Sequence, residues 1–294
     1  MEVRASSLNK ADWYDLTAPF PLRLIAGGGI RKPRNEWMGG DVAGRVESVG
    51  PNVNRFKPGD EVYGVGRGTL AEFAIAREGR LALKPANLPF SEAAAVPIAG
   101  LTALQGLRKG MVEPGHRVLI DGGSGGVGTF AVQIAKAMGA EVTAVCSEKN
   151  LDEARRLGAD HVIDYSAEDF TKAEERYDII FGVNGFHSPF AYRRALTPKG
   201  RYLMAGSHKV LSALVQVAVL GPLLSRKAGK HLGFMGIAKV VPEDLASLKE
   251  LIEAGKVRPF VEKEYPLNAA AEAFRFFGEG HARGKVVVTV GPPP

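Results

Sequence analysis

The chain has 294 residues, of which 45% are hydrophobic and 24% charged, with a formal net charge of +6. This length allows two domains, and the composition is ordinary for a globular protein. Lysine and arginine form no continuous run, so the charge does not indicate a nucleic-acid-binding protein. The single cysteine, Cys146, excludes internal disulfides and zinc sites made of several cysteines. It fits a reducing compartment, and without a secretory signal at residues 1–9 we expect a cytoplasmic location.

Residues 1–91 have the pattern of short strands and turns. Alternating or apolar segments predict strands over residues 2–6, 42–49, 61–65 and 70–76, with turns rich in glycine and proline between them. Many short strands separated in this way are typical of a barrel-like β unit. Ser91 has the features of a helix N-cap, and a helix is expected to continue over residues 102–108.

From Arg117 onward, strands and helices are predicted to alternate. The expected strands are 117–122, 141–146, 161–164, 178–183 and 201–206, and the expected helices are 127–138, 150–157 and 188–196. This alternation predicts a parallel, doubly wound sheet. Further helices are expected over 242–254 and 269–277, and a closing strand over 285–290.

A glycine-rich loop follows the first predicted strand of this alternating region. Gly123, Gly125 and Gly128 have the spacing G-x-G-x-x-G, with a strand before them and a helix after them, as dinucleotide binding requires. The first glycine permits a tight turn, the second a close approach of pyrophosphate, and the third close helix packing. Helix N–H groups then point at the phosphates. The predicted cofactor-binding residues here are Gly123, Ser124, Gly125, Gly126, Val127 and Gly128.

Seven segments resemble the zinc-free medium-chain dehydrogenases/reductases of the quinone oxidoreductase type. They are LNKADWY (8–14), GGDVAGRVESVG (39–50), FKPGDEVYG (56–64), IAGLTAL (98–104), DGGSGGVGTFAVQIAKAMGAEVTAVCS (121–147), LGADHVIDYS (157–166) and ARGKVVV (282–288). The resemblance implies an α/β fold in which a Rossmann doubly wound parallel sheet is inserted in a GroES-like β-barrel catalytic domain. Its implied bounds are 1–91 and 237–294 for the catalytic domain and 92–236 for the Rossmann domain. The catalytic domain is expected to be N-terminally shortened, because such chains usually begin a strand or two earlier, and an uncovered sheet edge is expected there.

The resemblance also bears on metal binding. In zinc-dependent relatives a cysteine stands near the position of Asn9, and a His-Glu pair stands at the positions of Gly40 and Asp41. Gly40 has no ligand atom and one aspartate does not hold zinc alone, so we expect neither a catalytic nor a structural zinc. Without a Lewis acid, reduction of an already polarised acceptor remains feasible.

The end of the second predicted strand indicates which nicotinamide cofactor is bound. NAD-binding chains carry an acidic residue there for the ribose hydroxyls, whereas this chain has Ser147, then Glu148, Lys149 and Asn150. The hydroxyl of Ser147 and the cation of Lys149 suit the 2′-phosphate of NADPH, whereas the negative charge of Glu148 argues against it. By resemblance, Tyr165 also reaches that phosphate. The other contacts implied by the resemblance are Thr102, Val183, Gly185, Gly206, Phe234 and Lys285.

Two residues are predicted to face the reacting acceptor. By resemblance, Asn9 and Tyr14 line the substrate site, where Asn9 donates to the acceptor oxygen and Tyr14 donates or delivers a proton. For Asn9 the alternative is a turn residue, and for Tyr14 a packing aromatic. The apolar segment 210–224, followed by basic residues, is an apolar lid, a surface for peripheral membrane contact, or a buried helix and its connection.

These features favour an NADPH-dependent, zinc-independent reductase of small lipophilic quinones or α,β-unsaturated carbonyls. The alternatives are a non-catalytic NADPH-binding interaction protein and an enoyl-thioester reductase. Because many relatives are dimers, a homodimer is expected.

Overall fold

A computed structural model describes residues 1–17, 37–185, 187–207, 216, 218, 220, 221, 225, 229–280 and 282–291. The chain divides into two units. The first unit comprises Met1–Leu101, Lys239–Gly255 and Pro259–Pro294, and the second comprises Thr102–Ala238 and Lys256–Arg258. Most of the predicted segment 210–224 lies outside the described residues. Among the described residues, no helix has the length and apolar character needed to cross a membrane.

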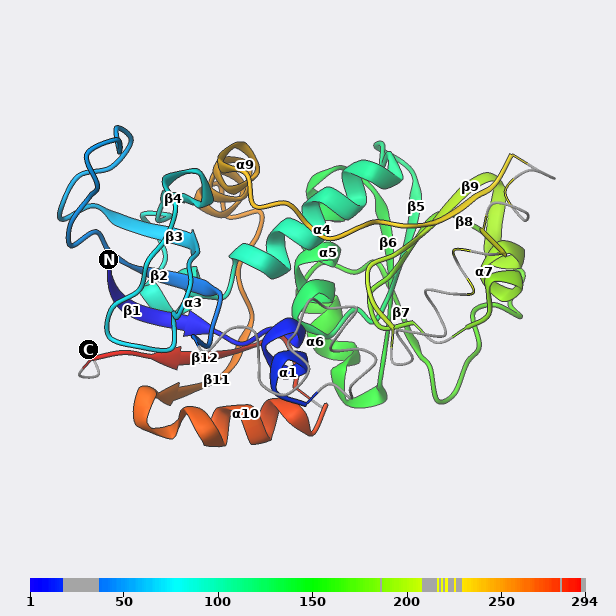
Figure 1. Ribbon diagram of the computed structural model, residues 1–294. Coiled ribbons are helices and arrows are strands. Elements are labelled where there is room, and N and C mark those ends of the chain that lie inside the picture. The colour runs from blue at the N-terminus through cyan, green and yellow to red at the C-terminus, as the bar shows by residue number, and fades with distance from the viewer. Residues whose placement is uncertain are drawn as a thin grey trace. The chain divides into compact units, whose positions relative to one another are not determined.

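A six-stranded sheet forms the centre of the first unit, in the order β11-β12-β1-β2-β3-β4 (Figure 1). Its strands are β1 (Glu2–Ser7), β2 (Asp41–Arg45), β3 (Glu61–Val65), β4 (Leu81–Leu83), β11 (Val261–Pro266) and β12 (Lys285–Thr289). Neighbouring strands are antiparallel except β11 and β12. Strands from both ends of the chain therefore share one sheet.

Three expectations for the first unit are wrong. Ser91 is not a helix N-cap, because the helix Phe90–Ala94 has Pro89 as its N-cap and contains Ser91. Residues 70–76 form no strand and contribute only isolated bridges at Phe73 and Ile75. Residues 72–74 join the start of β1 through two backbone hydrogen bonds, because β12 pairs with β1 only from Ala5 onward. The first strand is not an open edge either, since β12 covers one side of β1 and β2 the other. The C-terminal strand thus satisfies the backbone groups that an uncovered β1 would expose.

Helices pack on this sheet and around it. They are α1 (Lys10–Thr17), α3 (Phe90–Ala94), α9 (Pro242–Glu253) and α10 (Ala270–Gly278), with single 3₁₀ turns η1 (Glu78–Arg80) and η3 (Leu267–Ala269). The helix α4 (Pro97–Gly110) begins in the first unit and continues into the second. Alternate residues of β12, Val286 and Val288, pack with Leu8, Tyr265 and Ala273 in a core beside α10. Because side chains alternate along a strand, Lys285 and Val287 point to the opposite face.

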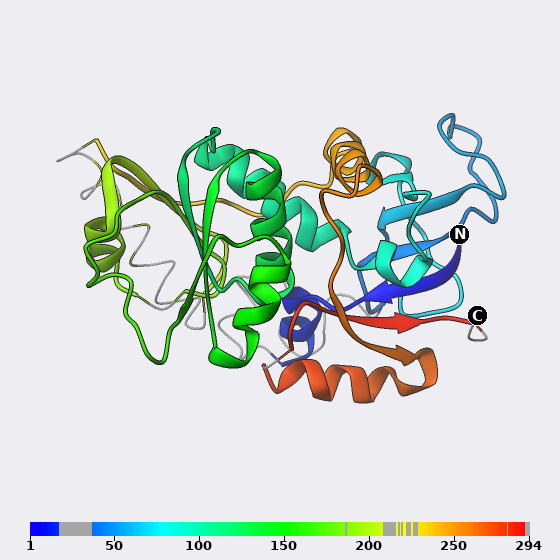
Figure 2. The ribbon, with the colours of Figure 1, turned by 180° about the vertical axis from the view of Figure 1, so that it is seen from behind.

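The second unit is built on an all-parallel sheet in the order β10-β9-β8-β5-β6-β7. Its strands are β5 (Arg117–Asp121), β6 (Glu141–Cys146), β7 (His161–Asp164), β8 (Tyr177–Gly182), β9 (Leu196–Met204) and β10 (His231–Phe234). Its helical elements besides α4 are α5 (Gly126–Ala137), η2 (Glu148–Asn150), α6 (Leu151–Arg156) and α7 (Pro189–Ala195). The strand order reverses beside β5, and α5 packs on β5 and β6 (Figure 2).

The predicted fold class is confirmed: a GroES-like unit and a Rossmann-type parallel sheet are both present. In a doubly wound sheet, ligands bind outside the carboxyl ends of the strands, at the point where the strand order reverses. In this unit that point is the end of β5, where the glycine-rich loop begins.

Candidate active site

The glycine-rich loop joins the end of β5 to the start of α5. Gly125 is the N-cap of α5 in an extended conformation and makes no side-chain cap, so the first N–H groups of the helix are available to a ligand. A Cβ on Gly125 would come no closer to its surroundings than 3.8 Å, from the oxygen of Gly122. A Cβ on Gly128 would overlap that oxygen and lie 2.8 Å from the carbonyl carbon of Gly123. Position 128 therefore accepts only glycine for steric reasons within the loop, whereas at position 125 the lack of a side chain leaves open space next to the backbone.

Asn150 links this loop to the end of β6. Its amide Nδ2 donates to the Ser124 hydroxyl at 3.1 Å and to the Ser147 hydroxyl at 3.0 Å. Each serine thus accepts from Asn150 and keeps its own hydroxyl hydrogen for a further acceptor. Asn150 is buried, and its Oδ1 has no hydrogen-bond partner in the part of the chain that the structure describes. The loop and these hydroxyls fit a ligand with anionic oxygens, as the diphosphate of a nicotinamide cofactor has.

The residues predicted to reach the 2′-phosphate lie at the carboxyl ends of β6 and β7. Ser147 is half-buried, and Glu148 and Lys149 are exposed. Tyr165, 63% exposed, follows β7, and its backbone N–H donates to the carbonyl oxygen of Cys146 at 3.1 Å. That bond brings Tyr165 beside the end of β6, although 18 positions separate it from Ser147.

The predicted nicotinamide-lining residues lie at the ends of β8 and β9. Gly185 forms a parallel bridge with Ser207, and the N–H of Gly206 donates to the Gly182 oxygen at 3.2 Å. A Cβ on Gly185 would lie 2.5 Å from Oδ2 of Asp121, which is why only glycine fits. The other predicted contacts of this unit are Val183 and Thr102, both half-buried, and Phe234 at the end of β10, which is 38% exposed.

A buried hydrogen bond that the sequence does not indicate lies below these glycines. The hydroxyl of Tyr192, on α7, donates to Oδ2 of Asp121 at 2.7 Å. Tyr192 also stacks on Tyr202, with ring centroids 4.0 Å apart. Burial, followed by the charge of Asp121, raises the pKa of Tyr192, so that the phenol keeps its proton. The bond fixes α7 to the end of β5, next to Gly122.

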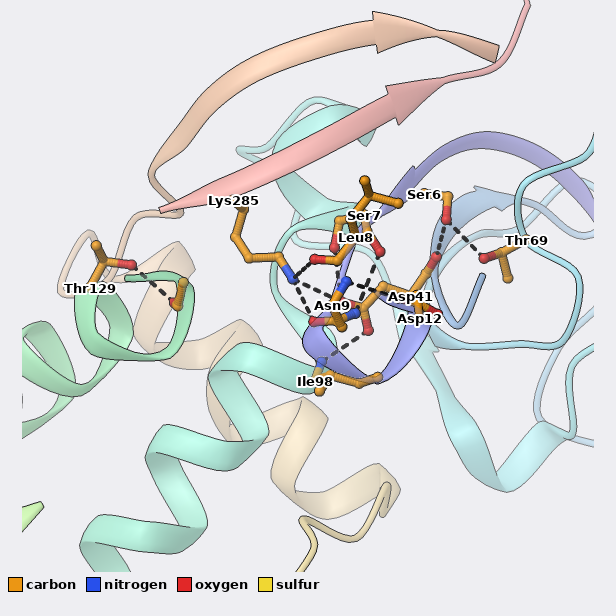
Figure 3. Close-up of polar contacts among 11 residues, drawn as sticks. Ser6, Ser7, Leu8, Asn9, Asp12, Asp41, Thr69, Ile98, Thr129 and Lys285 are labelled. Carbon is orange, nitrogen blue, oxygen red and sulfur yellow. Dashed lines mark hydrogen bonds and ion pairs between the residues drawn. The ribbon is translucent and has the colours of Figure 1, made fainter. Parts of the chain in front are cut away.

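In the first unit, Asn9 lies in a buried cluster of polar side chains (Figure 3). Nζ of Lys285 donates to Oδ1 of Asn9 at 2.7 Å and to the Leu8 carbonyl oxygen at 3.0 Å. Nδ2 of Asn9 donates to Oδ2 of Asp41 at 2.9 Å and to the Ser7 carbonyl oxygen at 3.4 Å. Both amide hydrogens of Asn9 are therefore used inside the protein. Lys285, predicted as a cofactor contact, is 3% exposed and points into this cluster.

Asp41 is the acceptor at the centre of the cluster. It is fully buried, and its Oδ2 accepts from Ser7 at 2.9 Å and from Lys285 at 3.4 Å as well as from Asn9. Its Oδ1 accepts from the backbone N–H of Ile98, in the first turn of α4, at 3.0 Å. Burial lowers the pKa of Lys285, and the charge of Asp41 opposes that shift. Ammonium and carboxylate thus compensate each other where neither is hydrated.

The helix α1 begins directly after Asn9. The Asn9 carbonyl oxygen accepts from the N–H of Trp13 at 3.2 Å, and the Asn9 N–H donates to Oδ2 of Asp12 at 2.8 Å, one half of a capping box. Burial raises the pKa of Asp12 to about 6. Tyr14, half-buried on the same helix, has a pKa raised by burial, so that its phenol is protonated at neutral pH.

The structure thus brings Asn9 and Lys285 together in the first unit. In the second unit, Asn150 joins Ser124 of the loop to Ser147, Tyr165 lies beside the end of β6, and Gly185 and Gly206 lie at the ends of β8 and β9. Sequence reasoning did not find the roles of Ser7 and Asp41 or the Asp121–Tyr192 bond. No cluster of histidine, cysteine, aspartate and glutamate suited to a metal ion occurs among the described residues.

Comparisons with known proteins bear on the family and the fold. Family models described as "Alcohol dehydrogenase GroES-like domain" and "Zinc-binding dehydrogenase" match residues 1–86 and 157–288. The chain is 37% identical over 281 residues to the mitochondrial NAD(P)H oxidoreductase RTN4IP1 of Mus musculus, covering 86% of this chain and 70% of that protein. It is 34% identical over 307 residues to the chloroplast envelope quinone oxidoreductase homolog of Arabidopsis thaliana, covering 98% and 88%.

Among solved structures, the quinone oxidoreductase of Coxiella burnetii matches with a TM-score of 0.85 and 28% identity, over 99% of this chain and 89% of that one. Homology and fold both support an oxidoreductase that uses a nicotinamide cofactor. The chain belongs to the quinone oxidoreductase-like group of the medium-chain dehydrogenase/reductase superfamily.

Proposed function

We propose that this protein is an NADPH-dependent, zinc-independent reductase of quinones or other α,β-unsaturated carbonyl compounds. The glycine-rich loop at the start of α5 carries the proposal, because its open N–H groups and the neighbouring serine hydroxyls suit a dinucleotide. When bound, NADPH supplies the hydride, and a hydride acceptor is the remaining requirement. The relatives named as quinone oxidoreductases support that acceptor class.

The first unit supports a reaction without a metal. Gly40 offers no ligand atom, and the oxygens of Asp41 already accept from Ser7, Asn9, Lys285 and the Ile98 N–H. A carboxylate engaged in this way is a poor zinc ligand, since the metal would have to displace a buried ammonium. Quinones and enones are conjugated carbonyls, already polarised toward hydride at carbon, so their reduction does not depend on a Lewis acid.

The chain's own residues then have distinct tasks. Gly125 and the first turn of α5 bind the diphosphate, while Ser147, Lys149 and Tyr165 bind the 2′-phosphate. Val183, Gly185 and Gly206, at the ends of β8 and β9, contact the nicotinamide. Tyr14 keeps its proton at neutral pH and is the group of α1 suited to donate to an acceptor oxygen as negative charge develops there.

Turnover with a panel of acceptors tests the proposed activity. NADPH oxidation is measured with quinones, with enones and with an enoyl thioester, in parallel with NADPH binding. We expect turnover with the first two classes. Binding of NADPH without turnover of any acceptor would refute the reductase and favour a cofactor-binding interaction protein, whereas turnover of the thioester alone would favour an enoyl-thioester reductase.

Cofactor preference is tested separately through Lys149→Ala. Because Lys149 is an exposed point charge, its removal is expected to raise the Kd of NADPH roughly five- to tenfold and to leave that of NADH unchanged. Lys199→Ala is the matched control, since Lys199 is an exposed lysine in the first half of β9, away from the carboxyl ends. If the parent protein binds NADH as tightly as NADPH, the assignment of the 2′-phosphate site is wrong.

Assembly and location remain predictions. The strand β10 lies at one edge of the sheet in the second unit, with no partner on its outer side among the described residues, which is compatible with pairing in a homodimer. A cytoplasmic location is proposed from the cysteine content, although the related mouse protein is named as mitochondrial.

A further inference from the structure

Lys285 and Asp41 fix the orientation of the Asn9 carboxamide. An ammonium only donates and an ionised carboxylate only accepts, so Oδ1 of Asn9 must face Lys285 and Nδ2 must face Asp41. Asn9 is 8% exposed, and its second amide hydrogen is used by the Ser7 carbonyl oxygen. One amide hydrogen is thus held by Asp41 and the other makes a longer contact of 3.4 Å with the Ser7 carbonyl oxygen, which disfavours donation to an acceptor oxygen.

The same contacts hold the chain just before α1. Lys285 binds the Leu8 carbonyl oxygen as well as Asn9, while Asp41 binds Ser7 and Asn9 from the other side (Figure 3). Three consecutive residues are thus tied to two buried charges. Because Asn9 also supplies the first carbonyl oxygen of α1 and binds Asp12 through its N–H, the position of the helix start follows from the position of Asn9.

Trp13 shows how closely the helix is seated. Its indole lies against Gly278 at the end of α10, where a Cβ would come within 2.6 Å of Cζ2 of the ring. A shift of the Asn9 end of α1 would move Trp13 off this glycine and would move Tyr14, the next residue, with it. The geometry of the helix start thus sets the place of the tyrosine.

We propose that Lys285 and Asp41 are positioning residues that act through Asn9 to hold α1, and with it Tyr14, in the place required for proton donation. This proposal rests on the proposed reductase activity for the role of Tyr14. Lys285 then stabilises the first unit and does not contact the cofactor. Asn9 connects the cluster to α1 and does not donate to the acceptor.

An exchange of the two polar groups separates positioning from direct donation. In Asn9→Asp/Asp41→Asn, the carboxylate at position 9 still accepts from Lys285, and the amide at position 41 donates to it and accepts from the Ile98 N–H. The net charge and size of the cluster are kept, and residue 9 has no amide hydrogens. The Ser7 hydroxyl turns to accept from the new amide, while the contacts of residue 9 with the Ser7 carbonyl oxygen and of Lys285 with residue 41 are lost. The single variants Asn9→Asp and Asp41→Asn, by contrast, place like charges together or leave Lys285 without its carboxylate.

The variants are made in a Trp37→Phe background, so that Trp13 is the only tryptophan of the chain. For Lys285→Met and both single variants we expect Trp13 emission at longer wavelength with greater acrylamide quenching, and kcat lower by roughly 10- to 100-fold. We expect the Kd of NADPH to change less than about twofold. The exchange is expected to restore the Trp13 emission and most of the kcat lost in the single variants.

Three results would overturn the proposal. If the exchange restores Trp13 but not kcat, Asn9 donates to the acceptor directly. If Lys285→Met weakens NADPH binding while Trp13 stays in place, Lys285 contacts the cofactor. If no variant moves Trp13, the cluster does not seat α1. The fluorescence readout needs no turnover, so a parent protein inactive with every acceptor would refute the proposed function and still leave the seating of α1 to be decided by Trp13.

Discussion

Alanine substitutions at Gly128 and Gly125, two glycines of one loop, are expected to have different effects: the first lowers the stability of the protein and the second weakens NADPH binding. At Gly128 the new Cβ overlaps the Gly122 oxygen and lies 2.8 and 2.9 Å from two carbonyl carbons, where ordinary carbon contacts are near 3.5–4.0 Å. These are backbone atoms, so α5 or the loop must shift by several tenths of an ångström or more. At Gly125 the new Cβ meets nothing closer than 3.8 Å, and its φ of −80° suits any residue.

The magnitudes follow from these contacts. Overpacking of this kind costs about 2–3 kcal/mol, so Gly128→Ala should lower the Tm of the second unit by roughly 5–10 °C. Gly125→Ala should keep the parent Tm within about 1 °C, because no native contact is lost or compressed. Its methyl group instead occupies the space where the diphosphate approaches, so the Kd of NADPH should rise at least tenfold, or about 1.4 kcal/mol.

Differential scanning fluorimetry without cofactor and fluorescence titration with NADPH measure the two effects independently. Gly115→Ala is a control of a different kind, since nothing lies near its Cβ but its φ of +81° is unfavourable for alanine. It should lose some stability without a specific loss of NADPH affinity. A Gly125→Ala protein that binds NADPH like the parent would refute the placement of the diphosphate, and a Gly128→Ala protein of parental stability would refute the steric argument.

Two further predictions concern buried polar groups. The pKa of Asp12 is about 6 in the folded protein and near 3.9 in the unfolded chain. The folded state is therefore favoured most below about pH 4, where Asp12 is protonated, and this contribution to its stability is lost as the pH rises through 6. Asp12→Asn should therefore be more stable than the parent by about 1–2 kcal/mol at pH 8, allowing for the partial exposure of Asp12, and the gain should vanish near pH 4 in urea denaturation; a gain independent of pH would contradict this. Tyr192→Phe should cost about 1–3 kcal/mol, because Asp121 loses a buried donor, and adding Asp121→Asn should return part of that loss.

Local patterns in the sequence predict much of the second unit. The run Val118 to Ile120, the glycines after it and the apolar face of the next helix suffice to locate β5, the loop and α5, because each is decided by neighbours along the chain. Neither β10 nor β11 is predicted in this way. The strand β10 has only four residues, and half of the residues of β11 are charged, so that these strands depend on the sheets that receive them.

The first unit shows a different limit. The segment Leu70 to Ala76 alternates as a strand should, yet it pairs only through isolated bridges, one of them with Glu2 where β1 extends past β12. A pattern of alternation shows that a segment suits a sheet, but not how many residues of a neighbouring strand are left for it to pair with. The α1 helix was not predicted either, because its eight residues carry no apolar stripe and its start is fixed by Asn9 and Asp12.

The roles of Lys285 and Asp41 could not be predicted, because they depend on strand register. In the β1–β12 ladder, Ala5 faces Thr289 and Ser7 faces Val287, and the N–H of Leu8 donates to the Val286 oxygen. Continued by two residues, this register places Asn9 opposite Lys285, although 276 positions separate them. A slip of one residue would turn Lys285 toward the apolar core of Val286 and Val288 and bury its charge without a partner. The charge that orients Asn9 therefore also selects the register in which the two ends of the chain join.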